Sequence, residues 1–525
     1  SIASSIASTT GPRVTLAAVS EKGASLVSPH LGRLILRAMP CSSRLPLDAL
    51  PAWARLNGAA FTRVKLQEVD GKGFGLIADT ELGNQETGAD ALMKIPRDLV
   101  LSAEAVDEYA KVDGNFKQLL EAVGYQSGRK KVMLYLLCHL VRSRRGQAAS
   151  RGISPTPWTE YARFLPRPMA MPTMWSDAER LLLNGTSLQV SRNLKDAALD
   201  AKLSALADEF DELREATEAL PFWNANLWEH NTASVDDWVL VDAWYRSRCL
   251  ELPQVGAAMV PGLDMVNHSS SPTAYYEVDG GSEVALLMRP GCRASGGQEV
   301  TISYGESKSA AEMLFSYGFI DGDSTARELT LHLEPFPDDP LAKAKLDVFR
   351  GAPAARLSQE GGQAARWDSP FVYLMCLNEE DGLEFGLLQE TTGDRQIRLL
   401  WRGDDVTARA GDFEGLIRGH ELCDVFRLRA VAVLHELVET QLSGIRGGPR
   451  SEQLQQAAAA GLLRDEHVAA AQALKEAEGQ VLEAAAQALA GEKSNLLARD
   501  HVVAYLCRNG QAPAPCSANE DGDFS

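Results

Sequence analysis

An asparagine–histidine pair near the middle of the chain could bind a small charged molecule. Asn267 and His268 follow a short apolar strand and precede a loop of serines and a proline. An asparagine amide offers both a donor and an acceptor, so it suits the amino and carboxylate groups of a zwitterion. A lone histidine is more often structural, and no His or Cys at metal spacing accompanies this one. The pair predicts a ligand site at Asn267, leaves the part played by His268 open, and predicts no metal.

Two tyrosines follow this pair at positions where a hydroxyl can reach a cleft. Alternation along residues 300–304 puts Tyr304 at a strand end, on the same face as two aliphatic residues. Tyr317 ends a short helix, 309–317, which a Ser/Glu capping box opens and Gly318 stops. Each tyrosine could equally be a core aromatic, and the residues alone leave that alternative open.

A glycine-rich turn and an arginine are further candidates. Residues 70–75 join two short apolar runs, and strand continues at 76–78, so the helix of a dinucleotide-binding fingerprint is missing. The glycines either supply positive φ in a plain turn or let a ligand approach bare backbone. Arg248 closes a predicted helix, where a cation either compensates the helix dipole or holds a carboxylate by a two-pronged pair. Both features keep a structural and a binding interpretation.

The elements that position these residues form three blocks. Strand-like runs at 61–66, 75–78 and 91–95 come first, the pattern from about 103 to 250 is helical, and strands return at 275–278, 284–288, 300–304 and 328–333. From about 340 the chain is rich in Ala, Leu, Glu and Gln, which are strong helix formers. The sequence therefore predicts an α+β fold, in which a β-rich domain split by a helical insert precedes an all-α C-terminal domain.

Composition narrows the function classes. The 525 residues are enough for two or three domains, and the net charge of −19 argues against non-specific nucleic-acid binding, which needs a basic surface. No apolar run is long enough to span a bilayer, so we predict no membrane partner. The eight cysteines are scattered without a Cys-x-x-Cys pair, which fits free thiols better than disulfides or a zinc site.

Both ends of the chain predict segments outside the folded domains. Residues 1–47 are rich in Ser, Ala and Arg with only Glu21 as an acid, which indicates an organelle transit peptide or a disordered extension. The first residue is Ser, which indicates a fragment or internal numbering. Residues 510–525, rich in Pro, Ser, Gly and acids, predict a disordered tail.

Taken together and in order, the central motifs resemble the two C-terminal signatures of the SET-domain protein methyltransferases. Within that family the chain is similar to the Rubisco large-subunit lysine methyltransferase subgroup. The motifs lie at 261–269, 297–305 and 312–319. The resemblance, over about residues 53–333, implies a SET domain at 48–335 with its insert at about 103–250, and a helical substrate-binding domain at 336–509. No Cys-rich zinc segment follows Phe319, which agrees with a helical domain in its place.

This resemblance implies S-adenosyl-L-methionine as the cofactor and assigns roles to individual residues. The implied cofactor-binding residues are Gly73, Phe74, Gly75, Arg248, Asp264, Asn267, His268 and Tyr304, and the implied catalytic residues are Tyr317 and Tyr304. The backbone of the glycine turn would cradle the cofactor, with Arg248 near its carboxylate and Asn267 at its amino-acid end. His268 would meet the adenine through its backbone, and Asp264 would organise the turn. Lys72 departs from the subgroup, which often has an acid there.

The implied activity is transfer of a methyl group to a lysine of a non-histone protein. A neutral amine attacks the methyl carbon, and a narrow aromatic channel lined by Tyr304 and Tyr317 would lower the pKa of the lysine from its usual ~10.4. The resemblance and the N-terminal segment together predict the chloroplast stroma, with cytoplasm or nucleus as alternatives. Rubisco large subunit or aldolase would be the substrate. A protein-histidine methyltransferase and a non-catalytic SET scaffold remain open, as does the oligomeric state.

Overall fold

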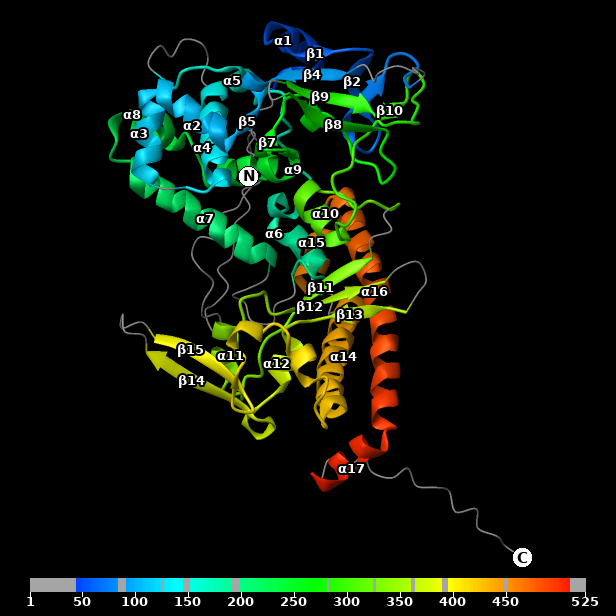
Figure 1. Ribbon diagram of the computed structural model, residues 1–525. Coiled ribbons are helices and arrows are strands. Elements are labelled where there is room, and N and C mark those ends of the chain that lie inside the picture. Colours follow the sequence, from blue (N-terminus) through cyan, green and yellow to red (C-terminus); the bar gives the residue numbers. More distant parts are fainter. Residues whose placement is uncertain are drawn as a thin grey trace, which may run out of the picture.

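The computed structural model describes residues 44–83, 91–124, 126–144, 152–189, 198–280, 283–323, 327–359, 364–389, 395–447 and 452–509. Figure 1 shows two parts joined along a long helix, α16, with the N-terminal sheets and the helical insert in one part and the C-terminal elements in the other. The predicted extension at 1–47, apart from residues 44–47, and the predicted tail at 510–525 lie outside the described residues.

Three small antiparallel sheets form the β-rich part. Their strand orders are β1-β4-β9-β8, β10-β3-β2 and β5-β7-β6. The strands are β1 (Ala60–Phe61), β2 (Val64–Val69), β3 (Gly73–Ala78), β4 (Met93–Pro96), β5 (Leu101–Ser102), β6 (Cys249–Leu252), β7 (Gly256–Met259), β8 (Ala274–Asp279), β9 (Glu283–Met288) and β10 (Glu299–Val300). Each sheet pairs strands from before the insert with strands from after it, which confirms the predicted split domain.

Helices fill the insert between β5 and β6. After α1 (Leu50–Leu56), the insert contains α2 (Ala103–Val112), α3 (Gly114–Val123), α4 (Gly128–Arg144), α5 (Pro157–Tyr161), α6 (Asp177–Arg180), α7 (Ala198–Thr217), α8 (Pro221–Trp223) and α9 (Val235–Arg248). Helix α4 is buried on every side from Val132 to Val141, because it is apolar all round and the other helices surround it. Helix α9 ends directly at β6, so its last turn points into the sheet region.

Beyond the sheets, the chain forms α10 (Ala310–Tyr317) and then the C-terminal part. Its helices are α11 (Ala342–Val348), α12 (Val372–Cys376), α13 (Phe413–Ile417), α14 (Cys423–Gly447), α15 (Glu452–Ala459), α16 (Asp465–Leu497) and α17 (Asp500–Arg508). Its strands are β11 (Glu328–His332), β12 (Ala354–Ser358), β13 (Arg366–Asp368), β14 (Leu383–Gln389), β15 (Arg395–Trp401) and β16 (Asp404–Asp405).

The C-terminal part is helix-rich, but the prediction that it is all-α is wrong, because it also contains strands. Strands β11 to β13 form one three-stranded sheet and β14 to β16 another, and the β14–β15 hairpin projects from the helices (Figure 1). The pairs Phe385–Leu399 and Leu387–Ile397 face each other across that hairpin. The alternating apolar pattern of these strands is short, and the helix-forming composition after residue 420 outweighs it in the prediction.

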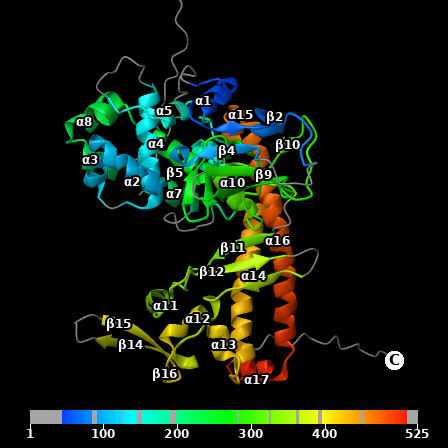
Figure 2. The same cartoon turned by 45° about the horizontal axis from the view of Figure 1, so that its top comes forward.

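Two main hydrophobic cores and a small third one hold the parts together. One core gathers the sheets and most of the insert, and another runs from β11 through α17. The third joins Trp175 and Leu183 of the insert, Leu314 of α10 and Leu474 of α16. Figure 2 shows α10 lying beside the upper end of α16 in a second orientation. Helix α16 therefore supports α10, which carries Tyr317.

Within the described ranges, no helix has the length and apolarity needed to cross a bilayer.

Candidate active site

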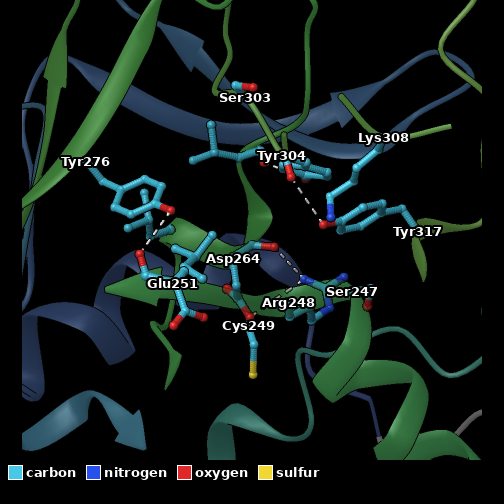
Figure 3. Close-up of a pocket in the computed structure, with 13 residues that line it drawn as sticks. Ser247, Arg248, Cys249, Glu251, Asp264, Tyr276, Ser303, Tyr304, Lys308 and Tyr317 are labelled. Carbon is cyan, nitrogen blue, oxygen red and sulfur yellow. Dashed lines mark hydrogen bonds and ion pairs between the residues drawn. The ribbon is translucent and has the colours of Figure 1, made fainter. Parts of the chain in front are cut away.

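A cavity of about 220 Å³, open to solvent, lies where α9 ends against the turn after β7 and α10. It is lined by Ser247, Arg248, Cys249, Leu250, Glu251, Leu263, Asp264, Val266, Tyr276, Ser303, Tyr304, Lys308 and Tyr317. Figure 3 shows Tyr304, Tyr317 and Lys308 gathered on one side, and Tyr276 on the other. Segments far apart in the sequence thus converge on one space that is open to solvent.

The turn after β7 is fixed by a buried carboxylate. Gly262 has a φ of +83°, and an added Cβ would lie 2.8 Å from the Phe61 ring, so the turn requires glycine. Asp264 Oδ1 accepts from the Gly262 N–H at 3.1 Å and from the Tyr161 hydroxyl, which itself accepts from the same N–H at 2.8 Å. Burial raises the pKa of the Asp264 carboxyl, although Arg248 and the donors oppose this. Asp264 therefore organises the turn.

Arg248 lies beside this carboxylate with hydrogen-bonding capacity to spare. Its Nη1 donates to the main-chain oxygen of Asp264 at 2.9 Å and lies 3.7 Å from the Oδ2 atom. Arg248 Nε and Asp264 Oδ2 are both buried, and neither has a hydrogen-bond partner in the described part of the chain. Buried polar atoms are rarely left in this state unless they serve a ligand or a functional site. The pair is therefore suited to a polar ligand in the cavity.

Tyr304 is held by the backbone on either side of it. Its hydroxyl donates to the Val266 carbonyl at 2.7 Å, and burial raises the pKa of this phenol well above its ordinary value. Ile302, two residues earlier, forms a parallel bridge with His268, and its N–H donates to the Asn267 carbonyl at 3.0 Å. This wall of the cavity is therefore part of the sheet core.

Tyr317 lies beside Tyr304, at the end of α10. The predicted capping box is present, because the Ser309 and Glu312 side chains each accept from the other's N–H, and Gly318 ends the helix with a φ of +84°. The Tyr317 hydroxyl lies 3.5 Å from the Tyr304 carbonyl, and the two rings are 4.7 Å apart. Burial raises the pKa of the Tyr317 phenol. At neutral pH it is a hydroxyl that can donate a hydrogen bond.

The side chain of His268 has a structural role. Its Nδ1 accepts from the Tyr304 N–H at 3.0 Å, so the proton lies on Nε2, which is 3.1 Å from Asp321 Oδ2. The histidine thus ties the segment of Tyr304 to the segment after α10. This leaves only its backbone for the predicted contact with an adenine. The strand predicted at 300–304 is shorter in the structure, where β10 ends at Val300 and Tyr304 lies in a bend.

The glycine turn and Asn267 meet through an acid that the sequence reasoning did not single out. The Asn267 amide donates to Glu299 Oε1 at 2.8 Å, and Lys72 Nζ lies 2.8 Å from Glu299 Oε2. A Cβ on Gly75 would lie 2.7 Å from Glu299 Oε1 and 2.8 Å from Asn267 Nδ2, so glycine allows this close approach. A Cβ on Gly73 would meet nothing. Glu299 therefore compensates the charge of Lys72, the residue that departs from the family pattern.

The cavity unites some of the predicted residues and not others. Arg248, Asp264, Tyr304 and Tyr317 line it, whereas Gly73, Phe74, Gly75, Asn267 and His268 do not. The last two directly follow Val266, which lines the cavity, so they lie next to it in the chain. Sequence reasoning missed Cys249, Glu251, Tyr276 and Lys308 as lining residues, and Tyr161 as a partner of the turn. Lys308 alone had a signal, because it lies between the two tyrosines.

Among the described residues, no group of three or more His, Cys, Asp or Glu side chains is arranged to hold a metal ion.

Three curated relatives are similar to this chain. The fission yeast "SET domain-containing protein 8" is 24% identical over 388 residues, 73% of this chain and 82% of the relative. The pea Rubisco large subunit N-methyltransferase, a chloroplastic protein, is 25% identical over 307 residues, 56% of each chain. The chicken actin-histidine N-methyltransferase is 22% identical over 381 residues, 66% of this chain and 57% of the relative. The chain therefore spans little more than half the length of the last two. No family model matches the chain.

Solved structures show the same fold. The SET domain of LSMT bound to methyl-lysine and AdoHcy aligns with a TM-score of 0.61 at 22% identity, over 91% of this chain and 98% of that one. Rubisco LSMT bound to AdoMet aligns with a TM-score of 0.59 at 21% identity, over 92% of this chain and 98% of that one. The alignments extend through the C-terminal part, so the likeness takes in both parts of the molecule. They confirm the predicted resemblance to the SET-domain methyltransferases and the predicted fold.

Proposed function

With the fold of the Rubisco LSMT structures as the premise, we propose that this chain is an S-adenosylmethionine-dependent protein-lysine N-methyltransferase acting on a non-histone protein. The observation that carries the proposal is the convergence of Arg248, Asp264, Tyr304 and Tyr317 on one cavity. These residues come from helix α9, a turn, the segment after β10 and helix α10. Core packing alone gives no reason for them to meet at an open cavity.

The residues present fit the cofactor. Its carboxylate suits Arg248, whose Nε is buried without a hydrogen-bond partner in the described ranges. Its amino group suits the Asn267 amide and the Glu299 carboxylate, which lie together over Gly75. The cofactor supplies an electrophilic methyl group on a sulfonium. The first of these contacts lies at the cavity, and Asn267 of the second directly follows Val266, which lines the cavity.

The chain itself must orient the acceptor amine and exclude water. The rings of Tyr304 and Tyr317, which contact each other, would lie along one side of the lysine stem. Burial against these rings favours the neutral amine, because desolvation disfavours its charged form. The Tyr317 hydroxyl oxygen would then accept from an amine N–H and leave the lone pair free, in line with the methyl carbon. Removing its hydroxyl should therefore affect rate rather than cofactor affinity.

The substrate and the compartment are finer proposals. The pea relative acts in the chloroplast by its name, which supports a stromal substrate of the Rubisco or aldolase type. The fission yeast relative comes from an organism without plastids, and this supports the cytoplasm or nucleus equally. The chicken actin-histidine N-methyltransferase supports a second candidate, transfer to a histidine of a protein substrate. A neutral imidazole nitrogen and a neutral amine need the same in-line geometry, so both fit the cavity.

The deciding experiment incubates the purified protein with methyl-labelled S-adenosylmethionine and either stromal or cytosolic extract. Mass spectrometry of the labelled proteins then identifies the modified residue. Labelled lysine supports the first proposal, and labelled histidine supports the second. Cofactor binding by calorimetry without any transfer in either extract would instead support a non-catalytic SET scaffold, and would contradict the enzyme proposal.

A further inference from the structure

Arg246, two residues before Arg248, links the insert to the helix that carries Tyr317. Its Nε donates to Asp242 Oδ2 at 2.7 Å, and its Nη2 donates to Thr173 Oγ1 at 2.7 Å. Its Nη1 donates to the main-chain oxygen of Phe315, and the guanidinium carbon lies 4.5 Å from the centre of the Phe315 ring. The side chain is only 12% exposed. One guanidinium therefore makes contact with three separate elements.

The Phe315 carbonyl needs such a partner because α10 ends there. The last carbonyls of a helix have no N–H of the next turn to pair with. The Gly318 N–H donates to the Leu314 carbonyl at 3.0 Å, and Arg246 donates to the next carbonyl, that of Phe315. A Cβ on Gly318 would lie 2.9 Å from Ala170, so the helix end rests directly on the segment that also holds Thr173. The final turn of α10, with Tyr317 in it, is clamped from the insert side.

A buried carboxylate keeps Arg246 in place. Asp242 is fully buried and accepts hydrogen bonds from Arg129 of α4 at 2.6 Å and from Lys202 of α7 at 2.9 Å, as well as from Arg246. Burial alone would raise the pKa of Asp242, but Arg246, Lys202 and Arg129 together hold it below its ordinary value. The carboxylate is therefore ionised and fixes three cations. Of these, only Arg246 also contacts α10 within the described residues.

We propose that Arg246 is a positioning residue for methyl transfer, which acts by fixing the end of α10 and thereby the hydroxyl of Tyr317. Its neighbours Ser247 and Arg248 line the cavity themselves, so one turn of α9 forms one wall and holds the other. The positive charge also suits the negative end of the α10 dipole. The inference rests on the proposed function and adds a residue that lies outside the cavity lining.

The test compares Arg246 with a matched member of the same cluster. Arg246→Lys keeps a charge near Asp242 but cannot make all three guanidinium contacts, and Arg246→Met removes them all. Lys202→Met removes another cation from Asp242 but leaves α10 untouched. Each variant is measured for its melting temperature, for S-adenosylmethionine affinity by calorimetry, and for single-turnover methyl transfer to the acceptor protein found by the extract experiment.

We expect both Arg246 variants to transfer roughly 10- to 100-fold more slowly at unchanged cofactor affinity, the scale typical of a misplaced catalytic group. Lys202→Met should lower the melting temperature and leave the transfer rate within about twofold of the wild type. Equal rate losses in Arg246→Lys and Lys202→Met would assign Arg246 to stability alone and overturn the inference. If Arg246→Met does not fold, the comparison of Arg246→Lys with Lys202→Met still tests the inference.

A double-mutant cycle tests the route through Tyr317. If Arg246 acts by placing the Tyr317 hydroxyl, Arg246→Lys should slow transfer by less than about twofold in a Tyr317→Phe background. A loss that multiplies with that of Tyr317→Phe would overturn the route. The proposed function fails separately, because in that case the wild-type protein itself transfers no methyl group.

Discussion

The two adjacent walls that carry the tyrosines of the cavity are held in different ways. Tyr304 lies in a wall made by backbone pairing, with a 2.7 Å bond from its hydroxyl to the Val266 carbonyl and a main-chain bridge two residues before it. Tyr317 lies on a helix end held by side chains, through Arg246 on one side and α16 on the other. Backbone ladders tolerate side-chain changes better than single contacts do. The wall of Tyr317 is therefore where small changes should alter transfer without unfolding the protein.

The largest effect should come from removing the Tyr317 hydroxyl. Tyr317→Phe keeps the ring, whose centre lies 4.7 Å from that of Tyr304, but loses the hydroxyl group. Turnover should fall by roughly 10²-fold or more, the scale for one positioned catalytic group, with cofactor affinity nearly constant. Single-turnover transfer, calorimetry and a melting curve measure this. Tyr276→Phe is the matched control on the opposite side of the cavity, and wild-type turnover in Tyr317→Phe would move the catalytic role to Tyr304.

Local sequence signals predicted the Tyr317 wall well. The Ser309–Glu312 capping box and Gly318 define α10 within a few residues, so the position of Tyr317 at a helix end could be predicted. The long-range contacts that hold that helix, and those that join α16 to the insert, could not be predicted. Arg246 and Phe315 are far apart in sequence, as are Ser187 and Glu478, and no local pattern indicates that they meet. Long-range pairs between polar side chains depend on how the elements pack, which periodicity does not specify.

The second effect concerns the contact between α16 and the insert. Glu478 on α16 is buried and accepts from the N–H of Ser187 at 2.9 Å and from its hydroxyl. Burial raises the pKa of Glu478 to about 7, although the Ser187 donors oppose this. Between its ordinary pKa near 4.5 and about 7, the folded protein binds more protons than the unfolded chain. Stability should therefore fall as pH rises through this window, by roughly 3 kcal/mol in all.

Glu478→Gln checks this pH dependence. The glutamine keeps one acceptor for Ser187 but cannot ionise, so denaturant unfolding should show a flatter pH profile between pH 5 and 7. Above pH 7 the variant should be more stable than the wild type. Glu476→Gln, two residues away and exposed, is the control and should leave the profile unchanged. A wild-type profile in Glu478→Gln would mean that this carboxylate is ionised throughout the window.

A smaller effect is expected from loosening the wall of Tyr304. Tyr161→Phe removes the hydroxyl that donates to Asp264 Oδ1 and accepts from the Gly262 N–H. Asp264 keeps its bond from Gly262 but loses a donor in a buried site, which costs about 2 kcal/mol of stability. The melting temperature should fall, and transfer by the protein that remains folded should change little. Tyr135→Phe, which loses a hydroxyl bond to Thr156 away from the cavity, provides the comparison. A large rate loss in Tyr161→Phe would show that the backbone wall is no more robust than the helix wall.

The smallest effect should appear at the edge of the backbone wall, where Asn267 meets Glu299. Asn267→Ala removes the amide that we propose holds the amino-acid end of the cofactor, while Glu299 keeps its ion pair with Lys72. Cofactor affinity should weaken by about 1–2 kcal/mol, because one partially exposed hydrogen bond is lost. Calorimetry with S-adenosylmethionine measures this without any acceptor. Glu299→Gln separates the amide from the charge: it keeps an acceptor for Asn267 but releases Lys72. Equal weakening in both variants would assign the contact to the carboxylate, whereas full affinity in folded Asn267→Ala would remove this asparagine from the cofactor site.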